Sequence, residues 1–420
     1  MRIIVNAYAC SPDMGSEPGM AWNWCVNLAK HCELFIITEG EFRDKIERAL
    51  VRLPQRDNMH FYYNPLSDKI RRMCWNQGDW RFYYYYKKWQ KKTYSIAKDI
   101  CQENSIDVLH QLNMIGFREP GYLWVLSKEK HIPFVWGPVD AKDKFPLAYC
   151  EGAGIKTKAF LWLKNTITKW QLSHDERVLA AAKQAAVLLG ASSNSVRSFK
   201  KYMGLDSILM NETGCNVIND KVESIAFNAD SKSIELKSSN TFDILWVGKM
   251  DFRKQLGLAL KTIATAYHED IRLHVLGSGD AETYKKLAAG LGIERNVVWH
   301  GAIPHAEVQK LMQECRLMLF TSVAEGTPHV VLEAIANGLP VVCHDTCGHG
   351  DSVTPDIGVK IPVKNPSESV RMFAEVLENL YMHPEYLETM SHNCKQRCEQ
   401  LSWDNKIKEF LSYVTDAIKK

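Results

Sequence analysis

The sequence from Glu325 to Pro340 has the residue types of an anion site at the start of a helix. Thr327 suits the cap of such a helix, the proline after it suits the first position, and a later glycine suits the end. The amides of a helix start are unpaired and attract phosphate. Here these amides belong to His329, Val330 and Val331. Glu325 precedes the helix and Glu333 lies within it, so both carboxylates are candidates to bind sugar or ribose hydroxyls.

Two lysines follow the first apolar strand of the second half of the chain. Lys249 and Lys254 leave the carboxyl end of this strand, so both could reach one diphosphate. Cations at that place would stabilise the negative charge that develops on a departing diphosphate. The sequence therefore predicts a diphosphate site built from two loops that lie far apart along the chain.

These motifs resemble the retaining glycosyltransferases of family 4, which have the GT-B fold. The hallmark of that family is a glutamate, seven residues and a second glutamate, followed by a segment that Ala334–Val342 matches, with Ile335 in place of methionine. A Gly-Arg…Lys pair of the family corresponds to Gly248-Lys249 and Lys254, so a lysine replaces the arginine and its bidentate fork is lost. The resemblance covers nearly the whole chain and includes residues 15–19, 107–110 and 133–139.

The resemblance implies transfer of a sugar from a UDP- or GDP-sugar to an acceptor hydroxyl, with retention at the anomeric carbon and without a cofactor or an essential metal. It makes Lys249, Lys254 and Glu325 the catalytic side chains, because the lysines hold the leaving diphosphate and the carboxylate binds the donor sugar. The remaining donor-binding residues are Glu333 on the ribose, Gly15 beside the diphosphate when the site closes, Ile303 beside the base, and the helix start at His329, Val330 and Val331.

The rest of the chain has the rhythm of an α/β protein. Short apolar runs alternate with amphipathic stretches over 420 residues, as in parallel sheets with helical crossovers. We expect two Rossmann-like parallel-sheet domains that face a cleft. The predicted boundaries are an N-terminal, acceptor-side domain over 1–210, a polar linker over 211–241, a nucleotide-sugar domain over 242–400, and a C-terminal helix over 401–420 that could pack back on the N-terminal domain.

The most unusual composition lies between residues 69 and 98, where cations and aromatic residues are interleaved with a single acid. Helices that lie in a membrane interface combine these features, so we expect contact with an anionic membrane surface. The candidate residues are Arg71, Arg72, Trp75, Trp80, Lys87, Lys88, Trp89, Lys91 and Lys92. A second basic and aromatic stretch covers 156–169. The alternative is a solvated basic helix whose aromatic side chains pack inward.

Two residues of the first half are candidates for contacts with the acceptor. His110 ends a strand and, with Asn113, is a candidate for the acceptor side, although a structural hydrogen bond is an equal alternative for His110. A zinc site around Cys343 and Cys347 is not expected, because no second ligand pair has suitable spacing.

The composition limits the partners and the compartment. Lys and Arg total 52 against 49 Asp and Glu, so the net charge of +3 does not favour a nucleic-acid partner. Scattered cysteines and the absence of a signal-like or spanning segment favour a cytoplasmic protein attached peripherally to the inner face of the plasma membrane, acting on a glycan or a lipid-linked glycan. Two other classes remain open: another GT-B enzyme, such as a nucleotide-sugar epimerase or a phosphorylase, and a non-catalytic sugar-nucleotide-binding protein.

Overall fold

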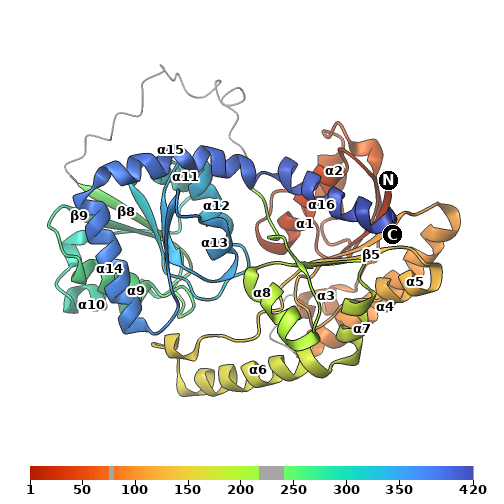
Figure 1. Ribbon diagram of the computed structural model, residues 1–420, viewed down its shortest axis with the longest axis horizontal. Helices are drawn as coiled ribbons and strands as arrows, with labels where there is room; N and C mark the ends of the chain where they lie inside the picture. The colour runs from red at the N-terminus through yellow and green to blue at the C-terminus, as the bar shows by residue number, and fades with distance from the viewer. Residues whose placement is uncertain (75–79, 217–240, 420) are drawn as a thin grey trace. The chain divides into compact units, whose positions relative to one another are not determined.

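The computed structural model describes residues 1–74, 80–216 and 241–419, and these residues form two compact units. Unit 1 comprises Met1–Lys144, Lys164–Thr213 and Trp403–Lys420, and unit 2 comprises Phe145–Leu163 and Gly214–Ser402. Each unit is built around one parallel sheet with helices on both faces (Figure 1). Among the described residues, none of the helices combines the length and the apolar character that crossing a bilayer requires.

Unit 1 contains a seven-stranded sheet in the order β3-β2-β1-β4-β5-β6-β7, in which every neighbouring pair is parallel. Its strands are β1 (Arg2–Ala7), β2 (Glu33–Thr38), β3 (Met59–Tyr63), β4 (Val108–Asn113), β5 (Phe134–Val139), β6 (Val187–Gly190) and β7 (Ile208–Leu209). Its helices are α1 (Ser16–Leu28), α2 (Arg43–Leu50), α3 (Asp68–Cys74), α4 (Trp80–Glu103), α5 (Leu123–Lys130), α7 (Glu176–Gln184), α8 (Ser193–Ser198) and α16 (Trp403–Lys419).

Alternate side chains of the unit 1 strands supply two cores, one on each face of the sheet. Ile3 and Val5 of β1 join a cluster with Trp24 of α1 and Phe410 of α16. Ile4, between them, joins a second cluster with residues of α4, α5 and α7. Because both faces are covered, β1 and β2 are buried almost along their whole length and do not alternate between exposed polar and buried apolar residues. The C-terminal helix thereby becomes part of the unit that the N-terminus begins.

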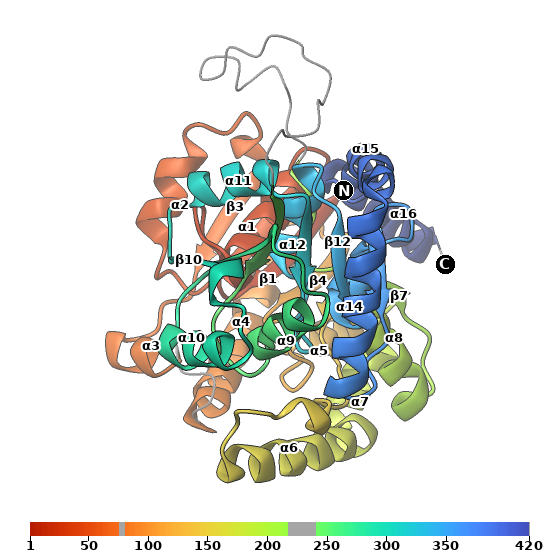
Figure 2. The same cartoon turned by 90° about the vertical axis from the view of Figure 1, so that its left-hand side faces the viewer.

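Unit 2 contains a six-stranded parallel sheet in the order β10-β9-β8-β11-β12-β13. Its strands are β8 (Phe242–Val247), β9 (Ile271–Leu276), β10 (Val297–Gly301), β11 (Leu317–Phe320), β12 (Val341–His344) and β13 (Gly358–Ile361). Its helices are α9 (Leu256–Thr265), α10 (Ala281–Gly290), α11 (His305–Glu314), α12 (His329–Ala336), α13 (Cys347–Ser352), α14 (Pro366–Met382) and α15 (Pro384–Gln400). Figure 2 shows α9 and α14 side by side, where they share one core cluster.

One segment divides differently from the expected 1–210 domain. Residues 145–163 group with unit 2, and the helix that they begin, α6 (Ile155–His174), continues into unit 1. Tyr149 explains the assignment, because it is completely buried in the unit 2 core and its hydroxyl lies 2.7 Å from the Ser369 hydroxyl. Local periodicity carries no information on such a long-range contact.

Candidate functional site

The predicted site residues of the second half converge at one point of the unit 2 sheet. The strand order reverses between β8 and β11, and ligands of open α/β sheets bind outside the carboxyl ends of the strands at such a point. Lys249 and Lys254 follow β8, and Glu325 follows β11. The two loops therefore meet where the topology alone would place a ligand.

Lys254 and Glu325 form an ion pair between these loops. The Lys254 Nζ lies 2.5 Å from the Glu325 Oε1, and only 18% and 16% of the two side chains are exposed. The Ser322 hydroxyl donates to the same carboxylate oxygen at 2.6 Å. The Lys254 ammonium also lies 5.7 Å from the centre of the Phe320 ring. The pair is thus positioned, partly desolvated and more strongly coupled than a surface ion pair.

Backbone contacts hold the two loops in this arrangement. The Thr321 hydroxyl lies 2.9 Å from the Lys254 carbonyl and accepts a hydrogen bond from the Trp246 indole at 3.1 Å. A Cβ at Gly248 would be in ordinary contact with the Lys254 methylenes, 3.4 Å away. Gly277 has a φ of +133° and packs against the Gly248 backbone so closely that no Cβ fits. Gly277 therefore allows the loops after β8 and β9 to pack closely.

Lys249 differs from Lys254 in its surroundings. Its side chain is exposed, and within the described parts of the chain it forms no ion pair. The adjacent Arg253 is paired with Asp251 at 2.7 Å. The structure thus brings Lys254 and Glu325 together, whereas the role of Lys249 remains a prediction.

Helix α12 begins one residue later than expected. Pro328 is its cap residue, and Thr327 is buried without capping it. The Val331 amide donates to the Pro328 carbonyl at 3.1 Å, so this amide is used inside the first turn and is not available to a ligand as predicted. The amides of His329 and Val330 remain candidates. Burial lowers the pKa of His329, so its imidazole is neutral at pH 7.

Glu333 lies in α12, and Ile303 follows β10. The Glu333 Oε1 is 3.2 Å from the His305 Nε2, and a third of the carboxylate side chain is exposed. Ile303 and Val330 are half-buried against the same core cluster. A carboxylate and an apolar side chain are thus both present for a ribose and a base.

Two residues that sequence reasoning did not single out support Glu325. Ser322 donates to its carboxylate, and the Cys347 thiol accepts from its backbone amide at 3.4 Å. In the sequence, Cys347 stands out only as part of the zinc site that the spacing argues against. The number of residues between Cys347 and Glu325 does not predict this contact. The contact forms because α13, which follows β12, lies beside the Glu325 loop.

His110 and Asn113 are both completely buried in unit 1. His110 donates from Nε2 to the Gly137 carbonyl at 2.7 Å, and burial lowers its pKa to about 4. Asn113 donates to the Ala9 carbonyl at 2.8 Å. This geometry favours the structural alternative for His110 and gives neither residue access to an acceptor.

The predicted membrane residues around α4 are also partly structural. Trp89 is buried, with its indole donating to the Asn64 carbonyl at 2.7 Å, so it cannot contact a membrane. Arg71 is half-buried and bound by Glu39 at 2.9 Å. Arg72, Lys88, Lys91 and Lys92 are exposed and Lys87 is half-buried. Trp75 and the Trp80 side chain lie outside the described residues.

The loop after β1 ends at Gly15, the cap residue of α1, and Glu17 lies in the first turn of this helix. Gly15 is exposed, and a Cβ added there would meet no atom within 4 Å, so the local fold does not require glycine. The Glu17 carboxyl is largely enclosed and accepts one hydrogen bond, from the Ile115 amide at 3.3 Å. Burial, with a smaller contribution from Asp140, raises the pKa of Glu17 to about 7.

This pKa makes the stability of unit 1 depend on pH. Between pH 4.5 and 7 the unfolded chain has released the Glu17 proton while the folded chain keeps it, so stability falls as pH rises through this range. Glutamine stays neutral, so at pH 8 we expect Glu17→Gln to be more stable than the wild type by about 3 kcal/mol, since folding moves the pKa from 4.5 to about 7 and each pKa unit corresponds to about 1.4 kcal/mol. At pH 4 the two should match.

Thermal and urea unfolding at pH 4, 6 and 8 would measure this difference. Glu103→Gln, at an exposed position of α4, is the matched control and should leave the pH dependence unchanged. Identical pH profiles for the wild type and Glu17→Gln would show that Glu17 is not titrating as described.

Comparison with known proteins finds similarity in the second half of the chain. Residues 228–397 match the family model described as "Glycosyl transferases group 1". A curated relative, lipopolysaccharide 1,6-galactosyltransferase of Escherichia coli (strain K12), is 32% identical over 152 residues, which are 35% of this chain and 41% of that protein. The matched segments span only 33–43% of the first curated relatives.

Solved structures extend the likeness to the whole fold. The apo form of the lipopolysaccharide outer core galactosyltransferase WaaB aligns with a TM-score of 0.64 and 16% identity, covering 99% of both chains. Anabaena Alr3699/HepE in complex with UDP aligns with a TM-score of 0.60 and 13% identity, covering 99% of this chain and 100% of that one. The expected fold class is confirmed: the chain contains two Rossmann-like parallel-sheet domains and has the GT-B fold.

Proposed function

We propose that this protein is a retaining, metal-independent glycosyltransferase of family 4 that moves a sugar from a nucleotide-sugar to an acceptor hydroxyl during assembly of a polysaccharide, a lipopolysaccharide or a capsule on a lipid-linked acceptor. The observation that carries the proposal is the Lys254–Glu325 pair at the switch point of unit 2. The family model covers both residues, and one curated relative is a lipopolysaccharide galactosyltransferase.

The proposed chemistry follows from the charges at this point. The Lys254 ammonium has hydrogens beyond the one directed at Glu325, and with Lys249 and the Val330 amide it would bind the diphosphate of a UDP- or GDP-sugar. Positive charge held here would stabilise the diphosphate as the bond to the sugar breaks. Glu325 would bind hydroxyls of the donor sugar, and Glu333 would bind the ribose. The leaving phosphate would help to take the acceptor proton.

Changing either member of the pair should abolish transfer without unfolding unit 2. We expect Lys254→Ala and Glu325→Gln to lower kcat/KM by at least about 100-fold, as removal of one charge-stabilising donor does in other enzymes. Release of nucleoside diphosphate from a panel of UDP- and GDP-sugars, with and without a glycan acceptor, measures this change. Nuclear magnetic resonance of the product gives the anomeric configuration.

Lys310→Ala and Glu314→Gln are matched controls, because these residues form an exposed pair on α11 of the same unit. Both controls should retain wild-type turnover. Full turnover by Lys254→Ala and Glu325→Gln would overturn the site. Sugar conversion without an acceptor would instead identify an epimerase, and donor binding without turnover would identify a binding protein.

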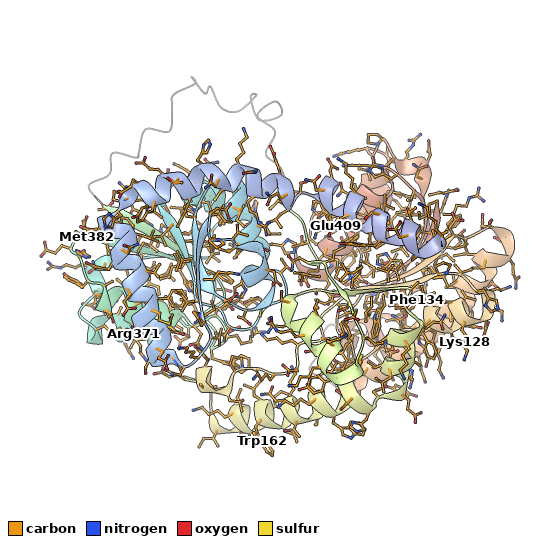
Figure 3. All side chains as sticks on the ribbon, viewed as in Figure 1. Lys128, Phe134, Trp162, Arg371, Met382 and Glu409 are labelled. Carbon is orange, nitrogen blue, oxygen red and sulfur yellow. The ribbon has the colours of Figure 1, made fainter. Side chains whose placement is uncertain are left out.

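We also propose that the enzyme works at the inner face of the plasma membrane and that α6, more than α4, contacts the lipid. One side of α6 is buried through Leu161, Thr168 and Leu172. The opposite side exposes large apolar side chains, of which Trp162 is labelled in Figure 3. Their exposed fractions are Ile155 87%, Phe160 61%, Trp162 60%, Leu163 49%, Ile167 43% and Trp170 59%.

The charges of α6 fit an anionic surface. Four exposed lysines, at positions 156, 158, 164 and 169, accompany the apolar stripe, and α6 contains no acidic residue. An apolar face with lysines and tryptophans is typical of helices that lie in the membrane interface. In α4, by contrast, the buried Phe82, Tyr86 and Trp89 form a core cluster.

Flotation with vesicles tests this assignment. We expect the wild type to float with phosphatidylglycerol-containing vesicles, and the double variant Trp162→Ser, Trp170→Ser to bind at least about tenfold more weakly, because it loses the two largest interfacial side chains. The double variant Tyr83→Ser, Tyr84→Ser, at exposed positions of α4, is the control and should float like the wild type. Flotation unchanged by the α6 substitutions would contradict the proposal.

A further inference from the structure

Unit 1 contains a cavity at its own switch point. The strand order of its sheet reverses between β1 and β4, and the cavity lies outside the carboxyl ends of β1, β2 and β4. Tyr8 and Ala9 follow β1, Glu39 to Phe42 follow β2, and Met114 follows β4. Its volume of about 180 Å³ suits one sugar ring rather than a longer chain. The general rule for open α/β sheets therefore predicts a ligand here.

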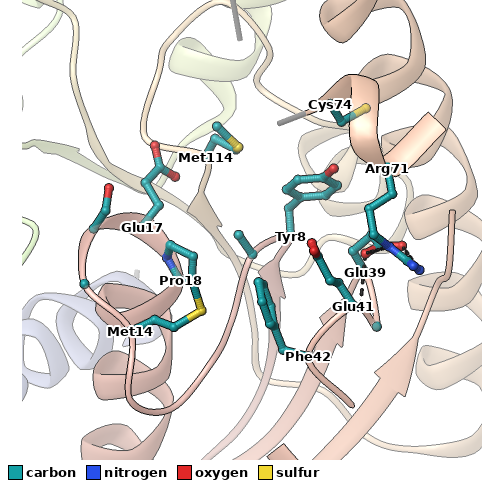
Figure 4. A pocket seen from close by; sticks show the side chains of 14 residues that line it. Tyr8, Met14, Glu17, Pro18, Glu39, Glu41, Phe42, Arg71, Cys74 and Met114 are labelled. Atoms are coloured by element: carbon teal, nitrogen blue, oxygen red, sulfur yellow. Dashed lines mark hydrogen bonds and ion pairs between the residues drawn. The ribbon is translucent and has the colours of Figure 1, made fainter. Parts of the chain in front are cut away.

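The walls of the cavity are largely apolar and partly aromatic. Figure 4 shows Tyr8 at its centre, with Phe42 below it and Met14 and Pro18 opposite. The Tyr8 ring is held edge-on by Tyr86 and Trp89, at 4.9 and 4.8 Å between ring centres. A fixed aromatic surface of this kind can cover the apolar face of a sugar ring.

On one side of the cavity the charged side chains are paired with one another. The Glu39 carboxylate accepts hydrogen bonds from the Arg71 guanidinium at 2.9 and 3.0 Å and from the amides of Leu66 and Glu41 at 2.6 and 3.1 Å. Arg71 also donates to Asp68 at 2.9 Å. Among the described residues that line the cavity, Arg71 is the one cation, so no unpaired positive charge remains for a phosphate or a carboxylate.

On the other side a carboxyl group is available. Figure 4 shows Glu17 beside Met114, across the cavity from the Glu39–Arg71 pair. Of its two oxygens, Oε2 accepts from the Ile115 amide at 3.3 Å, a distance at the long limit for a hydrogen bond. Most of its hydrogen-bonding capacity is therefore left for a ligand, and a carboxylate accepts best from hydroxyl groups.

We propose that this cavity binds one uncharged sugar ring of the acceptor, with Tyr8 and Phe42 against the ring and Glu17 accepting hydrogen bonds from its hydroxyls. That the bound sugar belongs to the acceptor rests on the proposed function. The preference for a neutral sugar follows from the cavity itself. Glu17, Glu39 and Glu41 oppose a single, already paired cation, so an acidic or phosphorylated sugar would be repelled. Glu17 then takes the place that sequence analysis gave to His110 and Asn113.

Binding of neutral methyl glycosides tests the cavity separately from catalysis. Saturation-transfer nuclear magnetic resonance with the methyl glycosides of glucose, galactose and mannose, and with glucose 6-phosphate and galacturonate as charged counterparts, gives affinities for the full chain. We expect at least one neutral glycoside to bind, and the charged sugars to bind at least about tenfold more weakly. At pH 8, where Glu17 is ionised, Glu17→Gln should weaken binding of the neutral glycoside about tenfold, as loss of a hydrogen bond to a charged group does.

Two variants make the result decisive. Glu17→Gln is expected to be more stable than the wild type at pH 8, so weaker binding cannot come from unfolding. Glu103→Gln removes an exposed carboxylate of the same unit and should bind like the wild type. Absence of binding by every neutral glycoside, or equal binding by the wild type and Glu17→Gln, would overturn the proposal.

The failure of this proposal can be told apart from that of the proposed function. Thermal stabilisation by UDP, GDP and their sugars reports on unit 2 through Lys254, because ligands of the folded state raise its stability. Glu17-dependent glycoside binding without nucleotide binding would uphold the cavity and overturn the transferase. Sugar transfer with an unaltered acceptor KM in Glu17→Gln would uphold the transferase and overturn the cavity.

Discussion

The ion pair between Lys254 and Glu325 is the constraint on which the rest of the unit 2 site depends. It joins two loops that lie about seventy positions apart in the chain, and it requires both of them to leave neighbouring strands at the same edge of the sheet. The hydroxyl of Thr321 fixes the backbone beside the lysine, and Gly277 allows the neighbouring loop to pack against Gly248. A partly desolvated pair is costly unless both partners stay in place. The surrounding contacts are therefore arranged to hold it.

The two sheets have similar topology but opposite chemistry at their switch points. In unit 2 the loop after the first strand carries Lys249 and Lys254, which suits an anionic ligand. In unit 1 the switch point carries Glu17 and Glu39, and Arg71 there is paired with Glu39. The same architecture therefore offers one site for a diphosphate and another for hydroxyl groups. The difference comes from side chains on loops, while the sheets provide equivalent positions for them.

Sequence patterns predicted the features that depend on local order along the chain. The parallel strands follow from continuous apolar runs, and Lys254 and Glu325 were found because each stands just after such a run. Burial of polar and aromatic side chains was not predictable in this way. His110 resembles an exposed residue at a strand end, but α16, from the far end of the chain, packs Phe410 against its ring at 5.0 Å. Likewise, only the packing of α4 on Tyr8 shows that Trp89 faces inward.

Glu17 and Glu39 show how a cost in stability can indicate function. Both carboxyl groups line the cavity of unit 1, and Glu39 is satisfied by four hydrogen bonds, two of them from a guanidinium. Among the described residues, Glu17 has one long hydrogen bond and no cation beside it, so its charge weakens the fold at neutral pH. A glutamine would fit the same space without this cost. A group that the fold does not need, at a place where sheets of this kind bind ligands, is best explained by what it binds.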